Sequence, residues 1–491
     1  MKSAPHSNLP TVALFPRHAT SWVKLFDLAC MLREGQKIRP VMILPTPDMS
    51  GYAVLCSDEK IETIDLSTAR EAEIAKSGGL LRAILARLDN LFARHDRIAN
   101  CLPVSLLRFV DMRRRLRSEY DVFRGALATL APAAVMAPGD REASPVAAFL
   151  KAAADLGIPI VNASFGSPYA EGVALSRVGF PRFSLEWRHV PPVLNYVAAL
   201  LFPRQVYNAP QGRMLFSPAW LTFAHSSLGM LSDNPWVQGG GLSDYVLQHD
   251  ARRRQGFIDL GVPARKLVDV GDPSLDLLYA VYRERDKVRA ELLKAHALPQ
   301  RPKLVIFSVP NDAEHGVCDM TSHLERMRGY FEALGKSGAN VLASLHPKSR
   351  REDYQPLAAA SGVTLMNERL ANALPAADLF VCSTSSTVFW ARLCGIPTVH
   401  LNYWKVLDAD FEGVAGVENV ETPAEFARAL TRHIALNTID PAFQREAARL
   451  REDNQFDGKS AERIQRFLLG LVPISNRKKD EPAAPQRAAG V

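Results

Sequence analysis

The chain has 491 residues, of which 47% are hydrophobic and 23% are charged. This length exceeds what one hydrophobic core usually organises, so we expect two domains, and the composition excludes a fibrous or wholly disordered protein. The formal net charge of +7 favours anionic partners, but no basic segment carries interleaved aromatic residues or a nucleic-acid-binding motif, so nucleic-acid binding is not expected.

The cysteines and the N-terminus indicate the compartment. Six cysteines are scattered without a CxxC pair, which is typical of free thiols in a reducing environment. The first 18 residues lack the apolar stretch and the cleavage site of a signal peptide. No group of Asp, His or Cys has metal-ligand spacing, and the Asp-x-Asp pair at 408 and 410 is interpreted as a surface loop. We therefore expect a cytoplasmic protein without a metal or other cofactor.

The first part of the chain alternates strand-like apolar runs with amphipathic segments, which predicts a parallel sheet. Strands are expected at 11–18 and 38–47, a helix at 23–36, and helical periodicity from 69 to about 120. Residues 133–164 predict a strand, a helix and a second strand. The first of these strands ends in polar residues, and the carboxyl ends of parallel strands line the ligand crevice of such sheets.

Residues 165–241 have weak periodicity and many aromatic residues, prolines and glycines, so we expect an irregular insertion that could cap an acceptor site. Its apolar stretch at 190–203 is shorter than the roughly 20 residues of a membrane-spanning helix. We interpret this stretch as a buried core helix. The alternative is an interfacial helix on an anionic membrane surface, because Arg182, Arg188 and Arg204 flank it. The glycine run that closes the region is interpreted as a flexible turn between lobes.

Regular alternation returns after the insertion. A strand and a helix are expected at 243–261, and a crossing between lobes near 272–284. The second half repeats the β/α order of a Rossmann-like domain. Its strands are expected at 303–309, 340–346, 363–367, 378–384 and 396–402, and closing helices at 422–433 and 443–469.

Five consecutive small hydroxyl residues lie between an apolar strand and a helix in this second half. A helix N-terminus offers unpaired backbone N–H groups and the positive end of the helix dipole, so the cluster is expected to hold a phosphate. N-capping by a single serine is the alternative. The predicted donor-binding residues of the cluster are Ser383, Thr384, Ser385, Ser386 and Thr387.

Two further segments are expected on the same rim of the sheet. His346, Pro347 and Lys348 follow the strand at 340–346 directly. His346 is predicted to bind the donor and to stabilise a leaving phosphate through an imidazole N–H group, which would make it catalytic. Pro310 and Asn311 end the first strand of the second half and are expected under the donor's phosphates.

The His-Pro pair followed by the Ser/Thr cluster resembles bacterial surface-polysaccharide glycosyltransferases of the GT-B fold, including capsule polysialyltransferases and Kdo transferases. The resemblance covers about residues 240–465. In that family the two motifs bind the CMP part of a CMP-activated sugar, which implies this role for His346, Pro347, Ser385 and Ser386.

The segment LGVPARKLVDVGDPSLDLLY is similar to the stretch that precedes the donor domain in CDP-glycerol transferases and UDP-GlcNAc 2-epimerases. This similarity supports the fold more than the donor. A sugar-nucleotide epimerase therefore stays as the alternative activity, and a non-catalytic carbohydrate-binding relative as a third.

The acceptor half carries candidates without a signature. Inverting transfer needs one general base near the acceptor hydroxyl, and Glu142 and His18 follow strand ends that are expected to face the cleft. Arg17 and Arg141 are expected to bind the acceptor, since a guanidinium suits a carboxylate. Capping of the next helix by Asp140 and Glu142 is the alternative.

These features predict an α/β protein with a GT-B-like fold, in which two Rossmann-like domains face each other across a cleft. Residues 1–272 form the acceptor side, 273–475 bind the nucleotide, and 476–491 are a disordered tail. The expected activity is metal-independent transfer from a nucleotide-sugar donor, CMP-linked or UDP-linked, to a bacterial surface glycan or lipid-linked glycan acceptor. The protein is expected in the cytoplasm, peripheral to the inner membrane if its apolar helix is interfacial.

Overall fold

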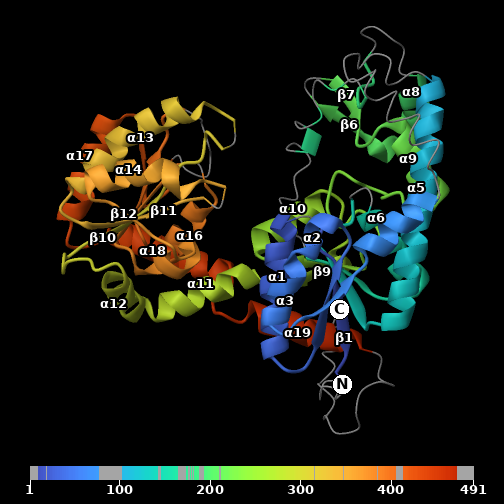
Figure 1. Ribbon diagram of the computed structural model, residues 1–491, viewed down its shortest axis with the longest axis horizontal. Coiled ribbons are helices and arrows are strands. Elements are labelled where there is room, and N and C mark those ends of the chain that lie inside the picture. The colour runs from blue at the N-terminus through green and yellow to red at the C-terminus, as the bar shows by residue number, and fades with distance from the viewer. Residues whose placement is uncertain are drawn as a thin grey trace. The chain divides into compact units, whose positions relative to one another are not determined.

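The computed structural model describes residues 9–17, 19–76, 102–141, 145–163, 173–174, 177, 180, 182–186, 193–209, 212–314, 316–346, 348–383, 385–404 and 413–472. The chain folds into two compact units (Figure 1). The first consists of residues 1–271 and 461–491, and the second of residues 272–460.

The first unit is built on a parallel sheet of seven strands among the described residues, in the order β3-β2-β1-β4-β5-β8-β9. The strands are β1 Thr11–Leu14, β2 Arg39–Leu44, β3 Glu62–Asp65, β4 Ala134–Ala137, β5 Ile160–Asn162, β8 Tyr245–Gln248 and β9 Leu267–Asp269. The helices are α1 Ala19–Glu34, α2 Pro47–Ser50, α3 Tyr52–Asp58, α5 Leu102–Leu130, α6 Val146–Asp155, α8 Val193–Leu201, α9 Ala219–Ser227, α10 Ala251–Asp259 and α19 Ser460–Leu471, with short 3-10 turns at Pro203–Gln205 and Ala264–Lys266.

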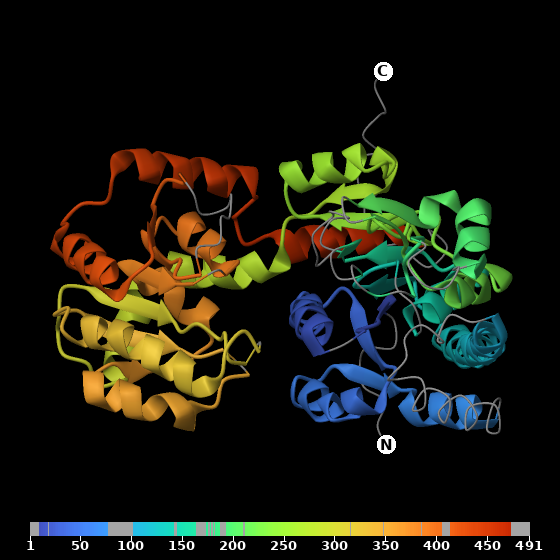
Figure 2. The ribbon, with the colours of Figure 1, turned by 90° about the horizontal axis from the view of Figure 1, so that it is seen from above.

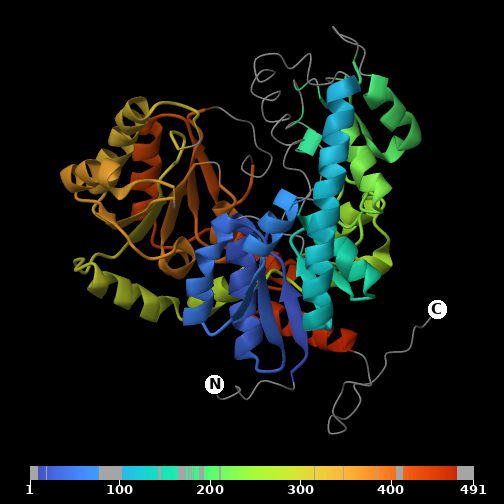
Figure 3. The ribbon, with the colours of Figure 1, turned by 45° about the vertical axis from the view of Figure 1, so that its right-hand side comes forward.

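Alternate side chains of the strands enter two separate cores, as the two-residue period of a strand requires. Val12 and Leu14 of β1 pack with α1 and α19 on one face. Ala13 and Phe15 pack with α5 and α6 on the other face. Figure 3 shows the long helix α5, in cyan, running along this unit, where its Arg108 guanidinium lies 6.0 Å from the Trp220 ring of α9.

The insertion between β5 and β8 is more regular than the sequence predicts. Its described residues form α8, α9 and an antiparallel hairpin of β6 Val206–Ala209 and β7 Gly212–Leu215. Two small apolar clusters hold it together, one around Trp236 and Phe216 and one around Leu215 and Ala198. The insertion therefore has a core of its own.

The last helix does not close the second domain, as the sequence analysis expects of residues 443–469. Ile464 and Leu468 of α19 are fully buried in the first unit's core beside Leu28 and Val12. α18 Pro441–Asp453 does pack in the second unit, through Leu450. The chain thus returns to the first unit at residue 461.

The described residues of the second unit form a parallel sheet of six strands in the order β12-β11-β10-β13-β14-β15. This unit is drawn mainly in yellow and orange in Figure 2. The strands are β10 Leu304–Ser308, β11 Asn340–Ser344, β12 Thr364–Leu365, β13 Leu379–Cys382, β14 Thr398–Leu401 and β15 Val417–Val420. The helices are α11 Pro273–Arg283, α12 Arg285–Ala295, α13 Met320–Gly335, α14 Arg351–Ser361, α15 Leu370–Ala373, α16 Thr387–Leu393, α17 Pro423–Ala435 and α18, with a 3-10 turn at Leu374–Ala376.

Helices cover both faces of this sheet as well. Phe307 and Val381 face α13, α14 and α17 in one core. Ile306 and Phe380, their chain neighbours, face α11, α15 and α16 in the other. Parallel strands with helices on both faces define a Rossmann-like domain, so the predicted α/β class with two such domains is confirmed.

Candidate functional site

The strand order of the second sheet locates its ligand crevice. β10 lies between β11 and β13. The strands β10, β11 and β12 follow one another toward one edge of the sheet, and β13, β14 and β15 follow one another toward the other edge. The boundary between β10 and β13 is therefore the switch point. Ligands of such sheets bind at the carboxyl ends of the strands beside this point.

The strand register brings three predicted segments to this edge. Ser308 pairs with Ser344 and Phe307 pairs with Val381, so the three strands end at nearly the same level. Val309 N–H also donates to the Ser344 carbonyl at 2.9 Å. Pro310, His346 and Ser383 follow these ends within two residues, and therefore lie on one rim.

His346 is half-buried on this rim, and its ring nitrogen Nδ1 accepts a hydrogen bond. The backbone N–H of Lys348 donates to His346 Nδ1 at 3.2 Å. A neutral ring with an accepting Nδ1 carries its proton on Nε2, which makes Nε2 an N–H donor. This tautomer suits the predicted contact with phosphate oxygen. Pro347, the other member of the pair, lies outside the described residues.

The hydroxyl cluster follows β13 and precedes the short helix α16. Ser385 Oγ accepts from the backbone N–H of Thr387 at 3.3 Å and lies 2.8 Å from Thr387 Oγ1. Ser386 occupies the N-cap position, but its side chain makes no capping hydrogen bond and is exposed. The Ser385 side chain therefore closes a short turn before α16, and the exposed Ser386 hydroxyl lies outside this turn. Thr384 lies outside the described residues.

The loop after β10 is fixed by side chains that the sequence analysis misses. Tyr403 OH donates to Asp312 Oδ2 at 2.5 Å, and His323 Nδ1 lies 3.8 Å from the same oxygen. Tyr354 OH donates to Glu314 Oε1 at 3.0 Å. The hydrogen bonds from Tyr403 and Tyr354 hold the loop that begins with Pro310 and Asn311 from two sides.

Burial dominates the titration of this network. It lowers the pKa of His323, which is completely buried, and the carboxylates of Asp312 and Glu314 offset only part of this effect. Burial also raises the pKa of Tyr403, and its hydrogen bond to Asp312 raises it further. For Glu314, burial raises the pKa, but hydrogen bonds from Ser349 and Tyr354 outweigh it and the net direction is downward. His323 is therefore neutral and Glu314 ionised at neutral pH.

The first sheet has an equivalent switch point between β1 and β4, where the predicted acceptor residues lie. Arg17 follows β1, and its backbone N–H donates to Ser21 Oγ at 2.9 Å. Arg141 follows β4, and its Nη1 donates to the Trp236 carbonyl at 3.2 Å, which ties this strand end to the insertion. His18 and Glu142, the predicted bases, lie outside the described residues.

Asp140, between β4 and Arg141, fastens the glycine run. Its carboxylate accepts the backbone N–H groups of Gly239 at 2.8 Å, Gly241 at 3.0 Å and Ser243 at 3.3 Å. A Cβ atom on Gly241 would lie 2.2 Å from the Asp140 carbonyl oxygen. The interpretation of this run as a flexible turn between lobes is therefore wrong: the run is internal to the first unit and needs glycine for close approach.

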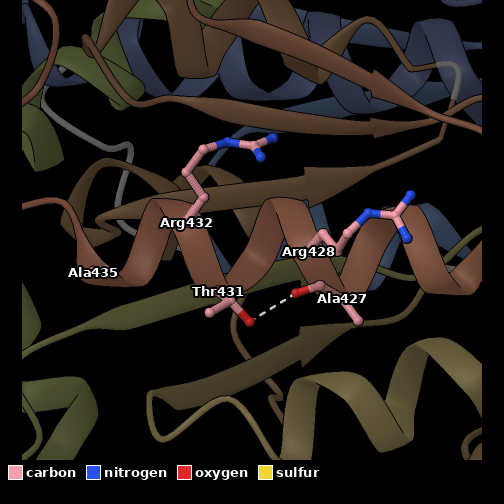
Figure 4. Close-up of a pocket in the computed structure, with 5 residues that line it drawn as sticks. All are labelled: Ala427, Arg428, Thr431, Arg432 and Ala435. Carbon is pink, nitrogen blue, oxygen red and sulfur yellow. Dashed lines mark hydrogen bonds between the residues drawn. The ribbon is translucent and has the colours of Figure 1, made fainter.

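A surface pocket elsewhere in the second unit has different chemistry. It is lined by Ala427, Arg428, Thr431, Arg432 and Ala435 (Figure 4). All five come from the outer side of α17, where Thr431 Oγ1 donates to the Ala427 carbonyl at 2.9 Å. None of its lining residues lies at the end of a strand, so this pocket is not assigned as the nucleotide site.

No group of three or more His, Cys, Asp or Glu side chains that could hold a metal ion occurs in the part of the chain that the structure describes. None of the helices in this part combines the length and the hydrophobicity of a membrane-spanning segment.

Comparisons with known proteins rest on structure. No family model and no curated protein matches the chain. The UDP-GlcNAc 2-epimerase from Neisseria meningitidis, bound to UDP-GlcNAc, is similar with a TM-score of 0.53 and 11% identity, over 94% of this chain and 99% of that one. Another UDP-N-acetylglucosamine 2-epimerase has a TM-score of 0.50 and 11% identity, over 98% of this chain and 100% of that one. The wall teichoic acid polymerase TagF has a TM-score of 0.47 and 10% identity, over 95% and 89%.

The class of fold follows from the two sheets and the two epimerase structures. The chain has the GT-B type of fold, with two Rossmann-like domains in one chain.

Proposed function

We propose that the protein is a nucleotide-sugar enzyme, and specifically a glycosyltransferase that moves a sugar from a nucleotide-activated donor to a bacterial surface glycan or lipid-linked glycan. The transfer would need no metal. The CMP-sugar is the favoured donor, by resemblance of the His-Pro and Ser/Thr motifs, and a UDP-sugar is the second choice. The enzyme would work in the cytoplasm, peripheral to the inner membrane.

One observation carries the proposal: the strand register that puts His346 on the same rim as Ser383 and Pro310. A phosphate at this rim would meet an imidazole N–H donor and small hydroxyl groups, which are the donors that oxyanions bind. The bonded loop from Pro310 to Glu314 would hold the floor of the site in place. The likeness to a structure bound to UDP-GlcNAc supports a nucleotide-sugar as the ligand.

The proposed transfer needs two proton-handling groups. An acceptor hydroxyl attacks the anomeric carbon while the bond from that carbon to the donor's phosphate oxygen breaks. A base removes the hydroxyl proton, and the charge that develops on the leaving phosphate is stabilised by the Nε2–H of His346 and by the hydroxyls of Ser383, Ser385, Ser386 and Thr387. Pro347, Lys348 and Thr384 complete the proposed donor site.

On the acceptor side, the proposal assigns the base to Glu142 and, second, to His18. Arg17 and Arg141 would orient an acidic acceptor or a donor carboxylate. Asp140 and Arg141 are both hydrogen-bonded to the insertion, which constrains the chain directly after β4.

A sugar-nucleotide 2-epimerase is the second candidate, because both structures with the higher TM-scores are UDP-GlcNAc 2-epimerases. This reaction consumes no acceptor. Incubation of the purified protein with UDP-GlcNAc alone, followed by chromatography of the sugar nucleotides, separates the two: accumulation of the C2 epimer supports the epimerase and contradicts the transferase.

The base assignment is tested with Glu142→Ala. We expect transfer from the donor to fall by at least about 100-fold, because general-base catalysis contributes 10²–10⁴-fold, while nucleotide binding stays unchanged. The exposed Glu71→Ala is the matched control and should keep full activity. A Glu142→Ala variant that transfers at the wild-type rate would exclude this role.

A further inference from the structure

Helix α8 carries its apolar side chains on the outside. Val193, Tyr196, Val197, Leu200 and Leu201 are exposed by 60%, 41%, 40%, 81% and 58%. Their spacing of three and four residues places them on one face of the helix. Isolated exposed apolar residues are common, but a continuous apolar helix face on a protein surface marks a site of interaction.

The orientation of α8 is fixed by polar contacts on its inner side. Asn195, which is 5% exposed, donates to the carbonyls of Arg182 at 3.2 Å and Ser184 at 3.0 Å. Tyr196 OH donates to the Leu185 carbonyl. Ala198 packs against Leu215 in the insertion's core. The outward apolar face thus results from a buried polar anchor, and the primary interpretation of this stretch as a buried core helix is wrong for α8.

Arginines lie near both ends of α8 and on the neighbouring hairpin. The backbone carbonyl of Arg182 accepts a hydrogen bond from Asn195 of α8. The Arg182 guanidinium lies 5.2 Å from the exposed Phe180 ring. Arg204 follows the end of α8 and stays 69% exposed beside Asp233. Arg213 is exposed on the β6–β7 hairpin. Glu186 is an exposed acid in the same part of the insertion, and its carboxylate accepts from the Arg213 backbone N–H.

We propose that the exposed face of α8 docks the protein on an anionic lipid surface. Val193, Val197, Leu200 and Leu201 would enter the acyl boundary, with the Tyr196 ring at its edge, and Arg182, Arg204 and Arg213 would meet the phosphate headgroups. Nine residues of helix extend about 14 Å, which lies along an interface and does not span a bilayer. Tyrosine beside leucine and valine, with arginine at the edge, is the composition of interfacial helices.

A second copy of the chain fits this face less well. A twofold dimer brings the same patch of both subunits together, so the arginines near the ends of α8 in one copy would come close to those of the other copy. Like charges at such an interface oppose association, whereas an anionic headgroup layer neutralises them. The excess of basic residues over the whole chain, +7, acts in the same direction.

Docking on a membrane would bring the enzyme to a lipid-linked acceptor, and this purpose rests on the proposed function. The docking itself is measured independently of activity. Retained nucleotide binding with lost membrane binding would therefore contradict this inference alone.

The full chain is tested by flotation with vesicles of phosphatidylglycerol and phosphatidylcholine, and with vesicles of phosphatidylcholine alone. We expect binding to the anionic vesicles, weakening with added salt. The double variant Leu200→Ser with Leu201→Ser should lower the partition at least about tenfold, since burial of one leucine side chain already corresponds to that factor. The pair Arg182→Gln with Arg213→Gln should lower binding to anionic vesicles only.

The matched control is Leu436→Ser with Ile439→Ser, which removes exposed apolar residues of the second unit and should not change binding. Unchanged thermal unfolding verifies that each variant is folded. Wild-type protein that does not float, equal binding to neutral vesicles, or an α8 variant that floats like the wild type would each overturn the inference. So would an α8 variant that changes the oligomeric state without lipid, because the face would then serve a second copy.

Discussion

Buried histidines give the molecule a dependence of stability on pH. His225 of α9 is 6% exposed, its Nε2 has no hydrogen-bond partner, and burial lowers its pKa from 6.5 to about 4. Below about pH 6.5 this histidine binds a proton in the unfolded chain but stays neutral in the native state. The free energy of unfolding of the first unit therefore falls as the pH decreases from about 6.5 to about 4, by up to about 3 kcal/mol. His323 acts with the same sign in the second unit.

Urea unfolding of the first unit at several pH values checks this effect. The wild type should lose stability on acidification, and His225→Leu should lose less, because leucine binds no proton. Equal pH slopes for the two proteins would contradict the assignment, whatever the difference in their absolute stabilities.

Among single residues, the sequence predicts the position of those that directly follow an apolar strand. His346 and Ser383 end apolar strands, and the pairing of those strands was implied by the β/α order. The partners of Asp312 could not be found in the same way, because Tyr403 lies 91 residues further along the chain and His323 lies on the next helix. A buried polar contact between distant segments leaves no periodic signal.

At the scale of elements, the loop from Gly239 to Ser243 depends on one carboxylate. Asp140→Ala leaves three backbone N–H groups without their acceptor, and two of the three lost hydrogen bonds are buried. We expect the free energy of unfolding to fall by roughly 3 kcal/mol. Asp140→Asn keeps an acceptor oxygen and should cost less. The comparison is Asp233→Ala, an exposed acid whose ion pair with Arg204 should contribute below about 1 kcal/mol. Equal unfolding midpoints for Asp140→Ala and Asp233→Ala would contradict this anchor.

Element prediction succeeds where the burial pattern is simple. β1 and β13 are buried at every position, so they read as continuous apolar runs. β3, with the sequence ETID, and β15, with VENV, are edge strands that are half-polar and at most partly buried, apart from Val420. Neither strand contains an apolar run that would predict it. The β6–β7 hairpin buries only Met214 and Leu215 of its strand residues. Its pairing depends on the insertion's own core, which the sequence does not delimit.

At the scale of the whole molecule, α19 couples the C-terminal end of the chain to the first sheet. Amphipathicity predicts that this helix buries one face, but both sheets offer an apolar surface, so the sequence does not decide between them. Ile464→Ala should cost about 2–5 kcal/mol, because the side chain is fully buried in the first core. Hydrogen exchange should then accelerate in peptides of β1 and β2, and stay unchanged in peptides of β10 and β11.

The exposed Arg466→Ala, on the same helix, is the control and should leave both sets of peptides unchanged. Faster exchange in β10 and β11, with β1 and β2 protected, would show that α19 stabilises the second unit.

The central claim concerns the rim formed by β10, β11 and β13, and a thermal-shift panel of CMP, CDP, UDP and GDP tests it most directly. A ligand bound only by the native state, at a hundredfold excess over its Kd, stabilises by about 3 kcal/mol and raises the melting temperature. We predict that at least one nucleotide, with CMP favoured, gives this shift in the wild type and in His433→Ala, and that His346→Ala loses most of it. A panel in which no nucleotide raises the melting temperature, or in which His346→Ala responds like the wild type, would contradict the account.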